Sequence, residues 1–307
     1  MQAEPRLSVV TGAFGFSGRH IARKLLQRGE RVRTLTKHRD ASLRHKDIEV
    51  APLDFGDIRS LTEAMTGARV LYNTYWVRFA YGAVNHGVAV ANTKLLIQAA
   101  EAAGVKRIVH VSITNPSPHS VLPYFQGKAE VEGAIRASAL TYAILRPAVL
   151  FGEGDILINN IAWLLRRLPL FAIPGKGQYR VQPIFVEDLA ELAVDSGRRE
   201  DSFILDAVGP EVYTYENLIR LIRTAIQSRS RICYLPPSMV RAASWILGLI
   251  VNDVVLTQDE VSGLMADLLV SQQVPTGRTS LKEWIEAHAQ TMGSTYASEL
   301  ERHYRRV

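Results

Sequence analysis

The first half of the chain alternates short runs rich in β-branched residues with segments whose apolar residues recur at helical spacing. This alternation is typical of a parallel sheet covered by helices. We expect helices at 17–28, at 57–65, in a long segment that ends at Gly104, and at 129–138. Gly29 and Asp57 support two of these boundaries, because glycine closes a helix readily and a carboxylate accepts first-turn N–H groups. Strands are expected at 7–11, 31–35, 48–53, 69–73, 107–112 and 141–146.

The rhythm changes after Pro147, where loops with glycine and proline interrupt shorter elements. A strand at 181–185, a helix from Glu187 and a strand at 203–206 continue the earlier pattern, and helices dominate the remainder. The pattern predicts an α/β protein whose residues 1–150 form a doubly wound parallel sheet, with a return to the sheet at 178–208. Residues 151–307 are expected to form a smaller, mainly helical C-terminal substrate subdomain.

The longest apolar stretch, 242–256, is interrupted by Asn252 and Asp253. It is too short and too polar to span a bilayer, so no transmembrane segment is expected. The stretch predicts a core helix, and contact with a membrane surface is the alternative. No apolar signal segment or amphipathic transit peptide precedes the first expected strand, which favours a cytoplasmic protein.

Composition narrows the classes of partner. The 307 residues are 47% hydrophobic and 21% charged, an ordinary globular balance. The 36 basic and 30 acidic residues give a net charge of +6 that is spread along the chain, so a solvated basic surface suits it better than a nucleic-acid interface. A single cysteine, Cys233, excludes an intramolecular disulfide, and no grouping of residues has the spacing of metal ligands.

A glycine-rich turn lies between the first expected strand and helix, in the sequence Thr11-Gly12-Ala13-Phe14-Gly15-Phe16-Ser17-Gly18. Glycine permits the backbone angles of a tight turn and leaves room for a pyrophosphate beside the backbone. The helix that follows offers free N–H groups and its positive dipole end to the phosphates. This position predicts a dinucleotide-binding Rossmann fold.

The chain resembles the short-chain dehydrogenase/reductase superfamily, because the turn has the form TGxxGxxG. Its resemblance is to the extended or atypical branch, which includes sugar-nucleotide epimerases and the accessory Rossmann subunit of mitochondrial complex I. Residues 146–152 resemble the RPxxxxG segment of that branch, and residues 182–190 resemble its later return to the sheet. The resemblance implies that Gly12, Phe14, Gly15, Phe16, Gly18, Asp54, Phe55, Lys128 and Pro147 bind the cofactor.

The end of the second expected strand bears on the choice of cofactor. An Asp or Glu there would bind the adenosine ribose of NAD(H), but the sequence reads Thr36-Lys37-His38-Arg39. A guanidinium can meet a 2′-phosphate with two parallel hydrogen bonds. We therefore expect Thr36, Lys37 and Arg39 to favour NADP(H), with NAD(H) possible and a solvated basic loop as the alternative. Asp54 also has an alternative role, which is to cap a turn.

Tyr124 and Lys128 form a YxxxK pattern in the helix after the fifth expected strand, and four residues place both side chains on one helical face. A neighbouring ammonium and a cationic nicotinamide would lower the tyrosine pKa from its ordinary value near 10. The resemblance implies that Tyr124 exchanges a proton with the substrate oxygen and that Lys128 also binds the nicotinamide ribose. A helix-surface pair is the alternative.

The family's usual Ser or Thr after strand five falls here on Ile113, flanked by Ser112 and Thr114. Strand alternation directs both flanking residues away from the face of Ile113, although a loop could turn Thr114 inward. Tyr75 and Trp76, after the fourth expected strand, either wall the substrate pocket or pack in the interior. His110 is expected to be a hydrogen-bonded core residue.

Two hypotheses follow. The first is an oxidoreductase or epimerase-like enzyme for a small organic substrate, with Tyr124 as general acid or base and Ser112 or Thr114 holding the substrate oxygen. The second is a protein that keeps the cofactor as a structural element or redox sensor and acts as an assembly partner. Ile113 and the bulky Tyr75-Trp76 pair favour the second. A homodimer is possible in either case.

Overall fold

The computed structural model of the chain describes residues 6–36 and 46–303. The chain forms two compact units, each built from separate segments. Unit 1 comprises Met1–Pro147 and Val186–Asp206, and unit 2 comprises Ala148–Phe185 and Ala207–Val307. The chain therefore leaves unit 1 after its sixth strand and returns to it for one helix and most of one strand.

Unit 1 contains a seven-stranded sheet in the order β11-β6-β5-β4-β1-β2-β3. The pairs from β3 to β6 run parallel, so the alternating pattern of the first half correctly predicts a Rossmann sheet. Its strands are β1 (Leu7–Thr11), β2 (Arg31–Thr36), β3 (Ile48–Pro52), β4 (Ala68–Asn73), β5 (Arg107–Val111), β6 (Thr141–Pro147) and β11 (Phe203–Ala207).

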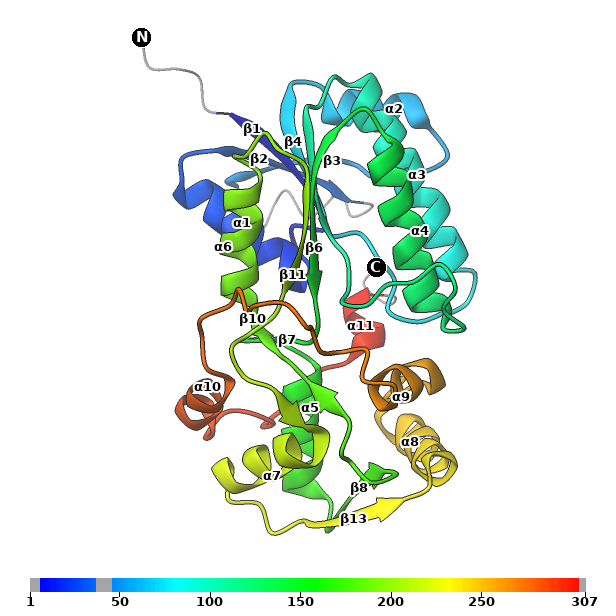
Figure 1. Cartoon of the computed structure of the whole chain (residues 1–307), viewed down its shortest axis with the longest axis vertical. Coiled ribbons are helices and arrows are strands. Elements are labelled where there is room, and N and C mark those ends of the chain that lie inside the picture. The colour runs from blue at the N-terminus through cyan, green and yellow to red at the C-terminus, as the bar shows by residue number, and fades with distance from the viewer. Residues whose placement is uncertain (1–5, 37–45, 304–307) are drawn as a thin grey trace. The chain divides into compact units, whose positions relative to one another are not determined.

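Helices cover both faces of this sheet (Figure 1). On one face α1 (Phe16–Gln27) packs against α6 (Val186–Ser196). On the other face α3 (His86–Ala102) packs between α2 (Ile58–Met65) and α4 (Pro123–Ala137). Fully buried apolar side chains from the strands and these helices form the core, among them Val9, Leu61, Leu71, Leu96, Ile108, Val131 and Ile144.

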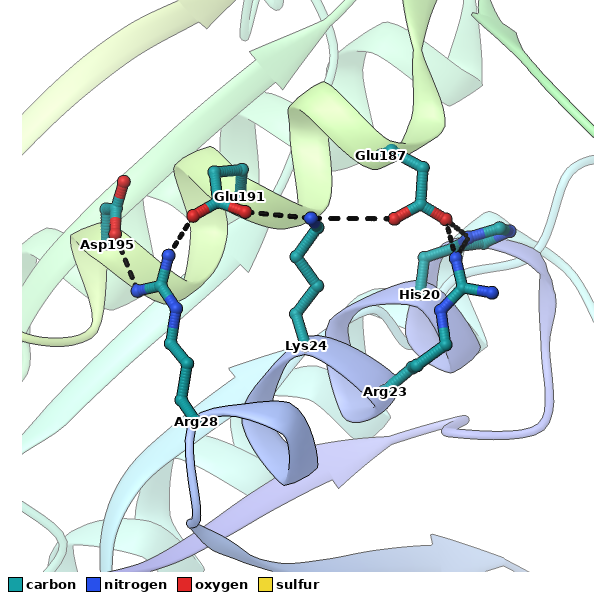
Figure 2. A network of polar contacts seen from close by, with 7 residues as sticks. All are labelled: His20, Arg23, Lys24, Arg28, Glu187, Glu191 and Asp195. Carbon is teal, nitrogen blue, oxygen red and sulfur yellow. Dashed lines mark hydrogen bonds and ion pairs between the residues drawn. The ribbon is translucent and has the colours of Figure 1, made fainter.

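A row of charged side chains links α1 to α6 (Figure 2). Glu187 accepts hydrogen bonds from His20 and Arg23, and Glu191 pairs with Lys24 and with Arg28. Asp195 continues the row, with its Oδ1 2.6 Å from Arg28 Nη1. These ion pairs join α6, in the returning segment, to α1, which follows the glycine-rich turn.

Unit 2 has a core of its own, in which Phe151, Ile161, Ile173, Ile219 and Ile285 are buried. Its helices are α5 (Leu157–Arg167), α7 (Tyr215–Ala225), α8 (Pro237–Val251), α9 (Gln258–Met265), α10 (Leu281–His288) and α11 (Glu299–His303). Its short strands are β7 (Leu150–Phe151), β8 (Leu170–Pro174), β9 (Arg180–Val181), β10 (Ile184–Phe185), β12 (Tyr213–Thr214) and β13 (Arg231–Leu235).

Two sequence predictions in unit 2 are wrong. The strand expected at 181–185 is two separate strands, β9 and β10, which belong to different sheets. Pro183 lies between them, and proline has no N–H group for a continuous ladder.

The core helix expected in the apolar stretch is the second error. Residues 242–251 belong to α8, whose only buried residue is Val240. Trp245, Ile246, Leu249 and Ile250 are between 55% and 76% exposed. A uniformly apolar stretch indicates a helix but does not show which of its faces the fold covers. None of the helices in the described part of the chain is both long and apolar enough to cross a membrane.

Candidate functional site

The glycine-rich turn joins β1 to α1 at the carboxyl end of the sheet. Gly12 adopts φ +69°, a left-handed conformation that favours glycine. A Cβ on Gly18 would lie 2.1 Å from the carbonyl oxygen of Gly12, so no larger residue fits without moving the turn. The turn closes with a hydrogen bond from Gly15 N to Gly12 O at 2.8 Å. The backbone here has the tight form that a pyrophosphate site requires.

The N-terminus of α1 suits an anion. Gly15 occupies the N-cap position and no side chain caps the helix there. The first turn of α1 also carries no acidic residue. Free N–H groups and the positive end of the helix dipole therefore face the turn, and they fit the pyrophosphate of a dinucleotide. Phe14 and Phe16 flank Gly15 in this turn, and Phe16 packs edge-on against His20.

Thr11 links the turn to the end of β4. Its hydroxyl accepts hydrogen bonds from the backbone N–H groups of Thr74, at 2.9 Å, and Tyr75, at 3.1 Å. Thr74 in turn donates to the carbonyl oxygen of Thr11. Threonine, at the start of TGxxGxxG, therefore holds two neighbouring strand ends together beneath the turn.

The residues expected to distinguish NADP(H) from NAD(H) are only partly described. Thr36 ends β2, next to the β1 strand end that carries the turn. Lys37 and Arg39 lie outside the described residues, so their recognition of a 2′-phosphate stays a prediction.

Asp54 and Phe55 follow β3. Asp54 Oδ1 accepts a hydrogen bond from Gly56 N at 2.9 Å, which is the turn-capping role given above as its alternative. The Phe55 ring packs against that of Tyr75, with 5.1 Å between centroids. Binding of the cofactor by this pair stays a prediction.

Tyr124 and Lys128 both belong to α4, which begins earlier than the expected 129–138 because Pro123 occupies its first turn. Lys128 is 2% exposed, and its ammonium donates a hydrogen bond to Val111 O, at the end of β5, at 2.9 Å. Tyr124 is half-buried one helical turn before it. The YxxxK pattern therefore lies at the same edge of the sheet as the glycine-rich turn.

Trp76 covers this pair. Its ring centroid lies 4.4 Å from the ammonium nitrogen of Lys128, a cation–π distance. The ring also packs edge-on against Tyr124 at 5.8 Å and stacks on His86 at 6.0 Å. A Cβ on Gly127 would lie 3.0 Å from the Trp76 ring, so this glycine allows the ring to approach α4 closely. Of the two roles weighed for Trp76, packing is the one these contacts describe.

Burial governs the charge of Lys128. Loss of water lowers the pKa of Lys128 to about 7, and the carboxylate of Glu132 partly opposes the shift. The neighbouring His110 is fully buried, and its pKa lies well below its ordinary value because of burial and the charge of Lys128. His110 Nδ1 lies 3.1 Å from Asn73 Nδ2, which confirms it as a hydrogen-bonded core residue.

Ser112 is buried and its hydroxyl donates to Glu132 Oε1 at 2.5 Å. Glu132 also accepts two hydrogen bonds from Arg146, from Nε at 2.9 Å and from Nη2 at 2.5 Å. A serine hydroxyl has one proton, so Ser112 in this arrangement can only accept a further hydrogen bond. A substrate carbonyl needs a donor, and Glu132 already takes the one that Ser112 has.

The neighbours of Ser112 are buried too. Ile113 is 6% exposed and Thr114 is fully buried. The Thr114 backbone N–H donates to Pro147 O at 2.9 Å, which ties the loop after β5 to the end of β6. The roles expected of Thr114 in holding substrate and of Pro147 in holding cofactor stay predictions.

Sequence reasoning missed His86, Asn92 and Glu132. Asn92 on α3 donates to the Tyr75 hydroxyl at 2.8 Å, and the His86 ring lies 5.6 Å from that of Tyr124. The spacing of Lys128 and Glu132, four residues apart on one helix, was a usable signal for the influence of the Glu132 charge on Lys128. His86 offered none, because its position depends on the path of the loop from Thr74 to Asn85.

Comparison with known proteins also indicates an NAD(P)H-binding domain. A family model described as NAD(P)H-binding matches residues 12–158. The chain is 27% identical over 288 residues to mitochondrial alpha-subcomplex subunit 9 of NADH dehydrogenase (ubiquinone) 1 from Arabidopsis thaliana, covering 86% of this chain and 71% of that protein. It is 29% identical over 247 residues to ceramide reductase from Caulobacter vibrioides, covering 77% and 76%.

A solved structure shares the fold. The NADPH-dependent quinone oxidoreductase of Escherichia coli, complexed with NADPH, superimposes with a TM-score of 0.73 at 21% identity, over 91% of this chain and 99% of that one. The turn, the sheet and these matches define an NAD(P)H-binding Rossmann protein. These matches support the resemblance of the chain to the extended, NAD-dependent epimerase-like branch of the short-chain dehydrogenase/reductase superfamily.

Proposed function

We propose that the protein binds NADP(H) in preference to NAD(H) and uses it to transfer hydride to or from a small organic substrate. The observation that carries this proposal is Lys128, held against the end of β5 one helical turn from Tyr124. When bound, the cofactor supplies or accepts the hydride. Similar proteins named as a reductase and an oxidoreductase also support hydride transfer.

In this proposal Tyr124 handles the proton. Its hydroxyl donates a proton to the substrate oxygen as a carbonyl becomes a hydroxyl, and the reverse reaction returns the proton to the phenolate. A charged Lys128 lowers the cost of that phenolate, because opposite charges favour ionisation. The lowered pKa of Lys128, about 7, makes this assistance strongest in neutral and mildly acidic solution.

Cofactor binding is tested by titration with NADPH and separately with NADH, followed by nicotinamide fluorescence. We expect NADPH to bind at least about ten-fold tighter, with the preference lost in Arg39→Ala and Lys37→Ala, since one charged hydrogen bond is worth about 1.5–3 kcal/mol. Arg136→Ala, an exposed arginine on α4, is the matched control and leaves the ratio unchanged. Tighter binding of NADH would contradict the cofactor preference.

Turnover is tested with carbonyl substrates and NADPH once binding is established. Tyr124→Phe keeps the ring contacts with Trp76 and His86 but removes the proton, so turnover falls by about 10²–10⁴-fold while NADPH affinity is retained. Unchanged turnover in this variant would refute the role of Tyr124.

A binding protein without turnover is the second candidate. Two observations favour it: Trp76 lies over Lys128, and the Ser112 proton is held by Glu132. A relative named as a subunit of NADH dehydrogenase fits this alternative. The binding role would be favoured by tight NADPH binding without turnover on any carbonyl substrate. NADPH affinity should then be unchanged in Tyr124→Phe.

A further inference from the structure

Helix α8 turns an apolar face to solvent. Met239, Ile246, Leu249 and Ile250 recur at intervals of three, four and seven residues and are 54% to 76% exposed. Ala242 and Ala243 share this face and are exposed as well. A surface helix ordinarily directs such a stripe at the core, so its exposure marks a binding surface.

The helix suits the boundary between water and lipid. Arg241 is the only charged residue in Pro237–Val251, and it donates to Gln258 Oε1 at 2.6 Å. Trp245, 68% exposed, borders the apolar face, and tryptophan favours the interfacial layer of a bilayer. Fifteen residues make a helix about 22 Å long, which fits one lying flat in that layer.

A basic groove lies beside the two-stranded sheet that β8 and β13 form. It has a volume of about 700 Å³ and lies where the loops after α5 and α7 lead into β8 and β13. Its twelve lining residues include four arginines and no carboxylate. Leu168 and Leu170 at its edge are 36% and 56% exposed. The arginines are Arg166, Arg167, Arg229 and Arg231.

These arginines divide into two pairs. Arg166 and Arg167 are anchored, because they donate to the backbone carbonyls of residues 289–294 at the end of α10. Arg229 and Arg231 are exposed, and among the described residues their guanidinium groups form no ion pair. Ser230 between them is 3% exposed, with its hydroxyl oxygen unpaired in the described part of the chain. The groove thus offers charge and hydrogen-bonding capacity to a phosphate.

Strand β13 connects the groove with the start of α8. Arg231 opens β13 beside Leu170 of β8, and β13 runs from there to the loop that begins α8 (Figure 1). Helix α8 also packs against β8. The five residues of β13 span about 16 Å, so both features can meet one extended partner.

We propose that this surface of unit 2 docks on an anionic phospholipid bilayer, with α8 lying in the interface and the groove arginines contacting lipid phosphates. Charge decides between occupants. A second copy of the chain meeting the same surface would oppose four arginines with four more. An anionic bilayer supplies phosphates and apolar depth together.

The test is sedimentation of the full chain with vesicles of phosphatidylcholine alone and with one third phosphatidylglycerol. We expect association with the anionic vesicles that weakens as salt is raised from 50 to 500 mM, and little with the neutral ones. Trp245 emission shifts to the blue on binding, and the shift is absent in Trp245→Phe. Lack of association with anionic vesicles at low salt overturns the proposal.

Variants separate the two features. Ile246→Glu with Ile250→Glu should lower partitioning by more than about ten-fold, because burial of two apolar side chains is lost. Arg229→Ser and Arg231→Ser should each lower it by about five-fold, but only for anionic vesicles. The controls are Val121→Glu, 93% exposed in unit 1, and Arg136→Ser on α4, and neither should matter.

Folding and self-association are checked on the same samples. Circular dichroism and thermal unfolding should be unchanged in all variants, because every substituted side chain is exposed. If light scattering shows a dimer that Ile246→Glu with Ile250→Glu dissociates, a second copy covers the face and the proposal is overturned. The proposal is also overturned if Ile246→Glu with Ile250→Glu, Arg229→Ser and Arg231→Ser all partition onto anionic vesicles as the wild type does.

Discussion

The glycine-rich turn and the Tyr124–Lys128 pair share one edge of the same sheet but differ in how far they are ready for a ligand. At the turn, the N-terminus of α1 has no side-chain cap, and Gly18 allows the backbone to close tightly against Gly12. Around the pair, the polar side chains already have partners within the protein. The Trp76 ring lies over the Lys128 ammonium, and Ser112 donates its hydrogen bond to Glu132. In the proposed site, the phosphate half is therefore preformed, while the reactive half is closed by internal contacts.

The difference has a physical cause. Backbone N–H groups at a helix end are fixed by the helix, so their direction needs no further support. An ammonium group on a long side chain is held in place only by its contacts. Lys128 donates a hydrogen bond to Val111 O and lies against the Trp76 ring. We expect cofactor affinity to depend on backbone geometry, and chemistry to depend on displacing an aromatic ring.

Gly18→Ala should have the largest effect on cofactor binding. Its Cβ would lie 2.1 Å from Gly12 O, so the turn must shift, and NADPH binding should weaken by at least about a hundred-fold for a distortion on the order of 3 kcal/mol. Gly29→Ala is the matched control, because Gly29 adopts φ +75° with nothing within 4 Å of its added Cβ. It should cost roughly 1–2 kcal/mol of stability and leave NADPH affinity unchanged. Equal affinities in both variants would remove the turn from the binding site.

Lys128→Met should change the pH dependence of stability. Because folding lowers the pKa of Lys128 from 10.5 to about 7, the unfolded chain binds more protons in that window. The free energy of unfolding therefore rises with pH from about 7 to 10, and the contribution reaches up to about 4 kcal/mol. The advantage of Lys128→Met over wild type should shrink across this window in urea titrations. The exposed Lys94→Met is the control, and parallel curves for wild type and Lys128→Met would contradict the burial of charge.

Trp76→Ala should have a smaller effect on the same quantity. Removing the ring admits water to the ammonium, so the pKa of Lys128 should rise by roughly one unit toward its ordinary value. The loss of cation–π attraction, about 0.5–2 kcal/mol, opposes this, but burial is the larger influence. Trp76→Phe keeps a ring and should leave the titration window unmoved. A downward move in Trp76→Ala would show that the ring stabilises the charged form.

Glu191→Gln should have the smallest effect. Glu191 is 45% exposed and pairs with Lys24 and Arg28 on α1, and such exposed pairs contribute about 0–1 kcal/mol. Unfolding free energy should fall by no more than that, less in 0.5 M salt, with NADPH affinity unchanged. Glu187→Gln, which removes the partner of the buried His20, should cost more. The reverse order would place the main energy of the α1–α6 contact at its exposed end.

The sequence predicted the fold of unit 1 well because its signals are local. Parallel strands buried on both faces appear as short apolar runs. Gly12 adopts a left-handed conformation and Gly18 has no room for a Cβ beside the Gly12 carbonyl oxygen, so glycine is required at both positions. Asp57 was correctly expected as a cap, and it accepts from Arg59 N and Ser60 N.

The contacts of the reactive half were not predictable in the same way. The placement of Trp76 against Lys128 depends on contacts between residues that are 38 to 52 positions apart along the chain. The bond from Ser112 to Glu132 joins a strand end to the middle of a helix. The prediction that α8 is a core helix failed for another reason. Its apolar composition fits a core helix and an exposed binding face equally well.

The division of unit 1 into two segments has a consequence for synthesis. After Pro147 leaves the ribosome, the nascent Rossmann sheet still lacks β11, and α1 still lacks the charged partner that α6 provides. The missing piece ends at Asp206, 59 residues later, or roughly 3 to 12 s at 5 to 20 residues per second. During this interval the face of the growing sheet that carries α1 lacks α6, so part of it is open to chaperones. Proteolysis of ribosome-bound chains should show protection of α1 only once residue 206 has emerged, well before the chain is complete.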